Sequence, residues 1–412
     1  MSERDQWQLD LVVFGASSFV GRILCEYLAE QFGTDGRRLA WGLAGRSEDR
    51  LHEVRDTLGP GAAELPVIVA DAQDEKALRQ LCDRTRVVVS TAGPYALMGE
   101  PLVRCCSGSG TDYCDITGEI QWIRQMIRRY GDTARQSGAR IVHCCGFDSI
   151  PSDLGVDFIQ QQSRDQFGMP ASRVKMRMRA IRGGLSGGTA ASLINVIREV
   201  AKDRQLRREI TSPYALCPPE HPFEARQPMV RGVQYDRDFQ SWVAPFLMAA
   251  INTRVVLRSH ALQHGAWGRD FQYEEASLTG PGVRGWLRAW GMSLSLNLFM
   301  AAVFLGSTRW LLERLFLPRP GEGPDRGTRE RGYFDMRFHG ETESGQTLRV
   351  RVTGDQDPGY GSTAKMLGEA AACLAGDDLS REGGFWTPAT LMGERLRERL
   401  EARAGLFFVR LD

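Results

Sequence analysis

The first 150 residues alternate short apolar runs with longer stretches that carry apolar side chains every three or four positions. Short apolar runs are typical of strands buried in a parallel sheet, and the longer stretches are typical of helices that cover such a sheet. This alternation predicts an α/β domain over residues 1–150 with a doubly wound parallel sheet. The expected strands cover 9–14, 39–44, 65–70, 86–90, 112–115 and 140–144, and the main helices cover 19–31, 74–82, 100–109 and 119–137.

The pattern changes after Gly146. Residues 173–181 and 347–355 alternate charged and apolar side chains with a period of two, which predicts strands with one buried and one solvated face. We therefore expect a second, α+β domain over residues 151–356, built on an antiparallel sheet and used for substrate binding or dimerisation. The strongly helical segment 357–412 is expected to return to the first domain.

The charge of the chain is nearly balanced. With 52 basic and 51 acidic side chains, the 412 residues carry a formal net charge of +1, so no broad electrostatic field would attract nucleic acid. Small ligands are therefore the expected partners. The nine cysteines include no C-x-x-C pair, which favours reduced thiols over a disulfide framework or a metal site. The N-terminal stretch lacks the apolar core of a secretory signal, so we expect a cytoplasmic protein.

A turn with two glycines follows the first expected strand and opens the first expected helix. In this context the first glycine permits a tight turn, the last lets the helix approach the sheet, and the helix N-terminus binds a pyrophosphate. Ser18 replaces the middle glycine of the usual pattern but still offers an N–H group and a hydroxyl. The turn predicts a Rossmann-like dinucleotide site, and the alternative is a purely structural turn. The expected cofactor contacts are Gly15, Ala16, Ser17, Ser18, Phe19, Val20 and Gly21.

The end of the second expected strand indicates which dinucleotide binds. NAD sites usually place an acidic residue there to hold the ribose hydroxyl. This chain instead has Arg46 and Ser47, a cation and a hydroxyl suited to a 2′-phosphate, which favours NADP(H). The alternative is that Arg46 is only a solvated residue at a helix start. Asp71, just past the third strand, either accepts from the adenine amine or caps the next helix.

Two further turns follow neighbouring strands. Ala92, Gly93 and Pro94 come after the fourth strand, where the nicotinamide half of the dinucleotide would pass. Asp115 and Glu119 cluster after the fifth strand. For these two carboxylates, helix capping and a local hydrogen-bond network are at least as well supported as a role in the reaction.

Eight motifs in this order resemble one family over essentially the whole chain: GASSFVGR, LAGRS, TAGPYALMGEPLVRCC, YCDITGE, CCGFDSIPSDLG, SGGTAAS, GYGSTAKM and FWTPATLMG. They resemble the saccharopine dehydrogenase-like oxidoreductases, in the branch that includes trans-acting enoyl reductases and lipid-droplet homologues. The resemblance implies an NADP-binding Rossmann domain, an α+β insertion and a returning C-terminal segment. It also implies reduction of an enoyl group in a lipid or polyketide acyl chain that serves glycolipid synthesis.

An enoyl reductase needs a hydride, which the cofactor supplies, and a proton donor near the developing enolate. The candidate catalytic residues are Tyr95, Asp148 and His143. The alternatives are that Asp148 caps the following helix and that His143 is a core residue. Two competing hypotheses for the whole protein are a non-catalytic, nucleotide-stabilised protein of a lipid surface and an amino-acid dehydrogenase of the saccharopine type.

The segment 289–308 is twenty residues long and has no charged side chain. Arginine and tryptophan residues flank it, and both residue types are enriched where a membrane meets water. We expect this segment to form a helix that attaches the protein peripherally to a lipid surface, such as the inner face of the plasma membrane. The alternatives are a buried core helix, a homodimer-interface helix and a membrane span.

Overall fold

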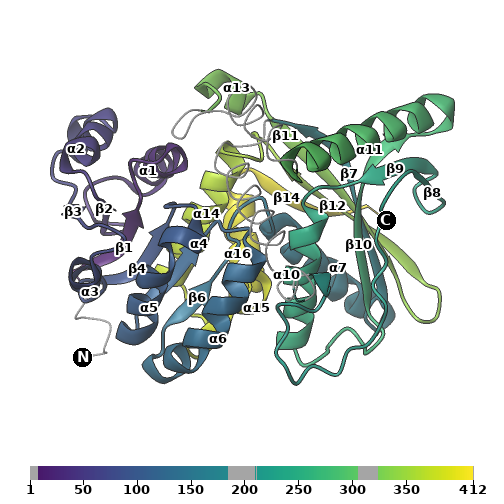
Figure 1. Cartoon of the computed structure of the whole chain (residues 1–412), viewed down its shortest axis with the longest axis horizontal. Coiled ribbons are helices and arrows are strands. Elements are labelled where there is room, and N and C mark those ends of the chain that lie inside the picture. The colour runs from purple at the N-terminus through teal and green to yellow at the C-terminus, as the bar shows by residue number, and fades with distance from the viewer. Residues whose placement is uncertain (1–7, 184–208, 210, 305–322, 412) are drawn as a thin grey trace.

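Two seven-stranded sheets organise the chain, with helices between them and around the first (Figure 1). The computed structural model describes residues 8–183, 209, 211–304 and 323–411. The motif at 186–192 therefore lies outside the described residues, as do the last residues, 305–308, of the apolar segment.

The first sheet is parallel throughout, which confirms the predicted doubly wound fold. Its strand order is β13-β6-β5-β4-β1-β2-β3, and the six predicted strands are all present. The seventh strand, β13, comes from the C-terminal segment and was not predicted. The strands are β1 (Leu9–Phe14), β2 (Trp41–Gly45), β3 (Val67–Val69), β4 (Thr85–Ser90), β5 (Asp112–Asp115), β6 (Arg140–Val142) and β13 (Gly384–Trp386).

The helices of this part cover the two faces of the sheet, as the 3.6-residue pattern indicates. On α1 the buried residues Ile23, Leu24 and Leu28 recur at helical spacing and pack into the core. Both α5 and α6 end where a glycine adopts the left-handed conformation, at Gly110 and Gly138. The helices are α1 (Phe19–Phe32), α2 (Glu48–Thr57), α3 (Glu75–Cys82), α4 (Tyr95–Met98), α5 (Glu100–Ser109) and α6 (Ile120–Ser137), with a short 3₁₀ turn at Pro60–Ala62.

The second sheet is mixed, which corrects the expected antiparallel sheet. Its order is β14-β12-β11-β7-β10-β9-β8, and β7 and β10 pair in parallel while the other neighbours are antiparallel. The connection from β7 to β10 permits the parallel pairing, because it includes two other strands and a helix and so is long enough to cross over. The strands are β7 (Arg173–Arg182), β8 (Gln234–Asp236), β9 (Ser241–Pro245), β10 (Gln272–Gly280), β11 (Tyr333–Glu341), β12 (Thr347–Gly354) and β14 (Leu406–Arg410).

One face of the second sheet is apolar and carries α7 (Ile150–Phe167), as the two-residue alternation predicts. Val174, Met176 and Met178 of β7 lie in the core, whereas the charged residues between them lie on the other face. Gly155 lets α7 approach closely, because a Cβ atom there would overlap the ring of Phe338. The remaining helices here are α10 (Ala249–Leu262), α11 (Gly282–Phe304) and α13 (Arg326–Glu330).

The C-terminal segment contributes to both sheets. Helix α14 (Gly361–Gly376) packs on α1 and on β1, β4 and β5, while β14 pairs with β12 of the second sheet. A buried contact fixes α14 on the first sheet, since Arg140 donates to the Leu374 carbonyl at 3.1 Å and also pairs with Asp112. Two shorter helices, α15 (Pro388–Leu391) and α16 (Gly393–Arg403), connect β13 to β14.

The apolar segment predicted at 289–308 lies within α11 as far as Phe304. None of the helices in the described ranges is long and apolar enough to cross a membrane.

Candidate functional site

The candidate site lies where β1 and β4 end side by side. These strands are neighbours, but the chain leaves them toward opposite edges of the sheet, and this reversal creates the crevice in which doubly wound folds bind ligands. Gly15 follows β1 with a φ of +84°, a conformation that glycine adopts without strain. A Cβ atom on Gly15 would lie 3.1 Å from the Cβ atom of Ala92, which follows β4. The two turns are therefore in close contact.

Gly21 and Ser18 shape the turn that was predicted to bind phosphate. A Cβ atom on Gly21 would overlap the Gly15 carbonyl oxygen and would lie 2.9 Å from the Cα atom of Ala16. The Ser18 hydroxyl caps α1 by accepting from the Gly21 N–H at 2.9 Å, and it donates to Thr91 Oγ1 at 3.0 Å. Thr91 in turn donates to the Gly15 carbonyl at 2.9 Å. Ser18 thus holds the turn together through its hydroxyl, at the position where the usual dinucleotide-binding pattern has glycine.

Three N–H groups of this turn remain available. The amides of Ser17, Phe19 and Val20 have no acceptor within the described part of the chain. They stand at the N-terminus of a fourteen-residue helix, whose dipole favours negative charge. The phenyl ring of Phe19 packs edge-on against Tyr360 at 4.7 Å between centroids, so this residue offers a ligand its backbone rather than its ring. The geometry suits a pyrophosphate.

The polar side chains after β2 and β3 differ in whether they already have hydrogen-bond partners. Arg46 is exposed and makes no ion pair or hydrogen bond with any described residue. Ser47 precedes α2, and its hydroxyl makes neither a capping bond nor a hydrogen bond with any other described residue. Asp71, by contrast, already accepts from the Gln73 N–H at 2.8 Å and thereby closes a local turn. The pair after β2 is better placed to bind an added phosphate than Asp71 is to bind the adenine.

The turn after β4 is held in place by a buried carboxylate. Ala92 is half-buried, Gly93 is exposed and Pro94 leads directly into α4, after a cis peptide bond. Glu119 is fully buried and accepts from the N–H groups of Tyr95 and Ala96, both at 3.0 Å. Glu119 therefore caps α4, which is the structural alternative considered for it, and positions the turn.

The phenol of Tyr95 is committed to the fold. It is 4% exposed and donates to the Ser90 carbonyl at 2.9 Å. Burial raises its pKa well above the usual range, and the nearby carboxylate of Asp115 raises the pKa further. Transfer of the Tyr95 proton to a substrate would first require breaking this bond.

His143 lies in an aromatic part of the core. Its Nδ1 atom is 2.7 Å from the carboxylate of Asp115, and its ring centroid is 5.0 Å from that of Trp122. Its Nε2 atom is buried and has no hydrogen-bond partner in the described ranges. Asp115 also accepts from the Tyr113 hydroxyl at 3.0 Å. These contacts favour the alternative that His143 is a core residue.

Asp148 has the properties of a proton donor. It lies between β6 and α7, and its carboxyl makes no hydrogen bond or ion pair with any described residue. Ser149, not Asp148, occupies the N-cap position of α7, so helix capping does not explain it. The residue retains some exposed surface, but protein atoms enclose the carboxyl, and this burial raises its pKa to about 7. Of the three catalytic candidates, the geometry favours Asp148.

The comparisons with known proteins show the family of this chain. Residues 11–142 match the family described as the saccharopine dehydrogenase NADP binding domain. Two Mycobacterium tuberculosis proteins are similar over nearly the whole chain. One is named as a trans-acting enoyl reductase and is 36% identical over 410 residues, covering 95% of this chain and 96% of its own. The other carries the same name provisionally and is 39% identical over 405 residues, covering 96% of both chains. This chain belongs to the saccharopine dehydrogenase family.

The fold and the cofactor agree with membership of the saccharopine dehydrogenase family. A saccharopine dehydrogenase from Saccharomyces cerevisiae superposes with a TM-score of 0.53 at 12% identity, covering 98% of this chain and 99% of that one, which shows the shared fold. NADP(H) is the cofactor of the first domain, and the residues present fit it. The available amides of Phe19 and Val20 suit its pyrophosphate, and the free guanidinium of Arg46 suits its 2′-phosphate.

Sequence reasoning missed a buried polar network beside Asp148. Glu275 of β10 accepts from the hydroxyls of Tyr273 at 2.6 Å and Ser152 at 2.7 Å and from the Asn252 amide at 3.0 Å. Ser149 joins it through Asn252, at 3.3 Å. Burial raises the pKa of Glu275 to about 7. The only signal in the sequence was an acidic residue at an inward position of an alternating strand. The network links the residue next to Asp148 to the second sheet.

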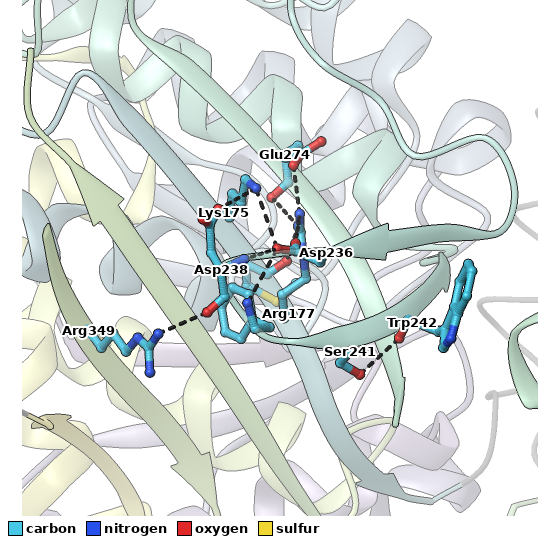
Figure 2. Close-up of polar contacts among 10 residues, drawn as sticks. Lys175, Arg177, Asp236, Asp238, Ser241, Trp242, Glu274 and Arg349 are labelled. Atoms are coloured by element: carbon cyan, nitrogen blue, oxygen red, sulfur yellow. Dashed lines mark hydrogen bonds and ion pairs between the residues drawn. The ribbon is translucent and has the colours of Figure 1, made fainter. Parts of the chain in front are cut away.

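A charged cluster, separate from the polar network around Glu275, lies on the outer face of the second sheet (Figure 2). Its residues line a cavity of about 460 Å³. Arg177 is 1% exposed and contacts Asp236 and Glu274 at 2.6 Å each, and Lys175 pairs with Asp236 at 3.5 Å and with Asp238. Both buried cations are thus already paired with carboxylates, so the cluster has the character of a structural ion network.

Proposed function

We propose that this protein is an NADPH-dependent enoyl reductase that acts in trans on a carrier-bound or lipid acyl chain, in lipid or glycolipid biosynthesis. The observation that carries the proposal is the protonatable carboxyl of Asp148, which has no partner among the described residues and lies close enough to Tyr95, just after the β4 turn, to raise the pKa of that phenol. The names of the two mycobacterial relatives support the reaction class.

Bound NADPH would supply a hydride to the β-carbon of an enoyl thioester. The chain itself must position the acyl group, exclude water and deliver one proton to the enolate that results. Asp148 holds a proton near neutral pH and has no competing partner among the described residues. Glu119 and the Ser18–Thr91 pair position the two turns that flank the crevice. Tyr95 and His143 contribute to the packing around Asp115.

An amino-acid dehydrogenase is the weaker candidate. A substrate with free carboxylates requires an unpaired cation, best supplied by arginine. In the charged cluster of Figure 2, both Lys175 and Arg177 are already paired with carboxylates. A protonated carboxyl at Asp148 suits proton donation better than recognition of a dicarboxylate.

We also propose that the protein is cytoplasmic and attaches peripherally to the inner face of the plasma membrane. The support is the charge-free stretch of α11 and the apolar nature of the proposed acyl substrate. A homodimer built on the same helix is the competing arrangement.

The reaction is tested by following the near-ultraviolet absorbance of NADPH with enoyl thioesters of short and long chain. The proposal expects the absorbance to fall with an enoyl thioester and the saturated thioester to accumulate in equal amount. Absorbance that stays flat with every acyl acceptor would indicate a non-catalytic protein. Oxidation of NADPH only with an imine derived from an amino acid would indicate an amino-acid dehydrogenase.

A further inference from the structure

Helix α11 packs on the protein through its smallest side chains. It contacts β9 and β10 of the second sheet and runs along the top of that sheet in Figure 1. Gly285, Ala289 and Ser293 recur every four residues and are buried. A Cβ atom on Gly285 would overlap the carbonyl oxygen of Gly280, so only glycine allows this close approach. From Gly285 to Ser293, the side of α11 that faces the protein is therefore a stripe of small residues, and Val303 is buried nearer the end of the helix.

The opposite side of α11 exposes large apolar residues to solvent. These residues are three or four positions apart, so they form one continuous stripe along the helix. An ordinary surface helix buries its large apolar residues and exposes its polar ones. The exposed residues are Val283 at 72%, Leu287 at 58%, Trp290 at 53%, Leu294 at 58% and Leu298 at 61%. Over residues 282–298, burial on α11 is thus the reverse of the usual pattern, and no described part of the chain covers this stripe.

The charges on α11 are all positive. Arg284 and Arg288 are exposed, and the helix from Gly282 to Phe304 contains no aspartate or glutamate. The rings of Trp286 and Trp290 meet edge-on, 6.3 Å between centroids, near these arginines. Exposed apolar residues combined with arginine and tryptophan are typical of a helix that lies in the interface of a membrane.

We propose that the exposed stripe of α11, Val283, Leu287, Trp290, Leu294 and Leu298, docks on an anionic lipid surface. The helix lies flat, with its small-residue side still packed on β9 and β10, and its apolar side chains enter the boundary between headgroups and acyl chains. Arg284 and Arg288 contact the lipid phosphates. The surface gives a physical basis to the peripheral location proposed above, but it does not depend on which reaction the site performs.

The positive charges on α11 favour a lipid surface over a second copy of the chain as the partner of the exposed stripe. Two copies joined through α11 would bring no acidic residue of either helix to Arg284 and Arg288, whichever way the two helices ran. An anionic lipid layer neutralises these arginines, and each basic residue near such a surface strengthens binding about fivefold.

The test measures flotation of the full-length protein with vesicles of phosphatidylcholine, with and without phosphatidylglycerol. We expect the protein to float with the mixed vesicles and to bind neutral vesicles more weakly. Leu287→Gln with Leu294→Gln should weaken binding by at least about tenfold, because two exposed leucines no longer enter the apolar boundary. Arg284→Gln with Arg288→Gln should weaken binding about 25-fold, on mixed vesicles only.

A matched control uses apolar residues that are exposed elsewhere. Phe407 and Val409 of β14 are 52% and 47% exposed, and Phe407→Gln with Val409→Gln should leave flotation unchanged. All variants should reduce a short, water-soluble enoyl thioester as the unaltered protein does, so failure of the reaction and failure of the docking are measured separately.

Three results would overturn the docking surface. The unaltered protein could fail to bind mixed vesicles, or the β14 variant could lose as much binding as the α11 variant. The third result concerns the oligomeric state. If sedimentation velocity found a dimer, and if Leu287→Gln with Leu294→Gln converted this dimer to a monomer without changing flotation, the stripe would be a contact between copies of the chain.

Discussion

Replacing Gly21 with alanine should disrupt the phosphate turn. The added Cβ atom would lie 2.9 Å from the Cα atom of Ala16 and would overlap the Gly15 carbonyl oxygen. Ordinary contacts begin near 3.4 Å, so the backbone must move by at least half an ångström. The Gly15 carbonyl cannot move freely, because it accepts from the Thr91 hydroxyl at 2.9 Å and from the Ser18 N–H at 2.8 Å. Overpacking of this kind costs about 1–3 kcal/mol.

Gly21→Ala is measured by thermal unfolding of the cofactor-free protein and by fluorescence titration with NADPH. We expect the Tm to fall by several degrees and the Kd for NADPH to rise by about tenfold or more, because the amides of Phe19 and Val20 move with the turn.

Gly108→Ala is the matched control, since Gly108 is an exposed helical glycine of α5 with open space around its Cα atom. That variant should be stabilised by about 0.5–1 kcal/mol and should bind NADPH unchanged. Unaltered NADPH affinity in Gly21→Ala would refute the assignment of this turn to the pyrophosphate.

Three further variants test the individual side chains. Arg46→Ala should raise the Kd for NADPH about 10- to 100-fold and leave that for NADH unchanged, because a charge-assisted bond is worth about 1.5–3 kcal/mol; equal losses for both would contradict a phosphate contact. Tyr95→Phe should keep kcat within about threefold and lower the free energy of unfolding by about 1 kcal/mol, since its hydroxyl bonds the Ser90 carbonyl. Asp148→Asn should lower kcat about a hundredfold and abolish the fall in kcat as the pH rises through about 7, where the carboxyl of the unaltered protein loses its proton. Because the folded pKa of Asp148 lies above its ordinary value of 3.8, the unaltered protein should lose stability as the pH rises between these values, and thermal unfolding should show a smaller loss for Asp148→Asn.

The first sheet could be predicted because its signals are local. Most strands of residues 9–142 are short apolar runs followed by a helix with its own periodicity, and the spacing of Gly15 and Gly21 specifies the turn between the first strand and helix. The role of Ser18 could not be predicted in the same way. Its partner, Thr91, lies 73 residues away, and only the pairing of β1 with β4 brings the two hydroxyls together.

The second sheet and the C-terminal strands were harder to predict for two different reasons. A two-residue alternation identifies a half-buried strand, but the alternation is the same whether the neighbouring strand is parallel or antiparallel. The sequences of β7 and β10 therefore could not predict that these two strands pair in parallel. Strand β13 has only three residues, too few for any periodicity. The apolar stretch of α11 was visible, but the side that faces the solvent depends on Gly285 fitting against Gly280.

The late position of β13 and β14 in the sequence also has a consequence for folding during synthesis of the chain. The last strand to be synthesised in each sheet forms an outer edge, β13 beside β6 and β14 beside β12. During translation, β6 and β12 therefore present open edges until residues 384–410 emerge, and unpaired edges are prone to join other chains. A chain that stops before Gly384 would leave both edges open at once, so we expect nonsense or frameshift products truncated there to aggregate rather than survive as a free nucleotide-binding half.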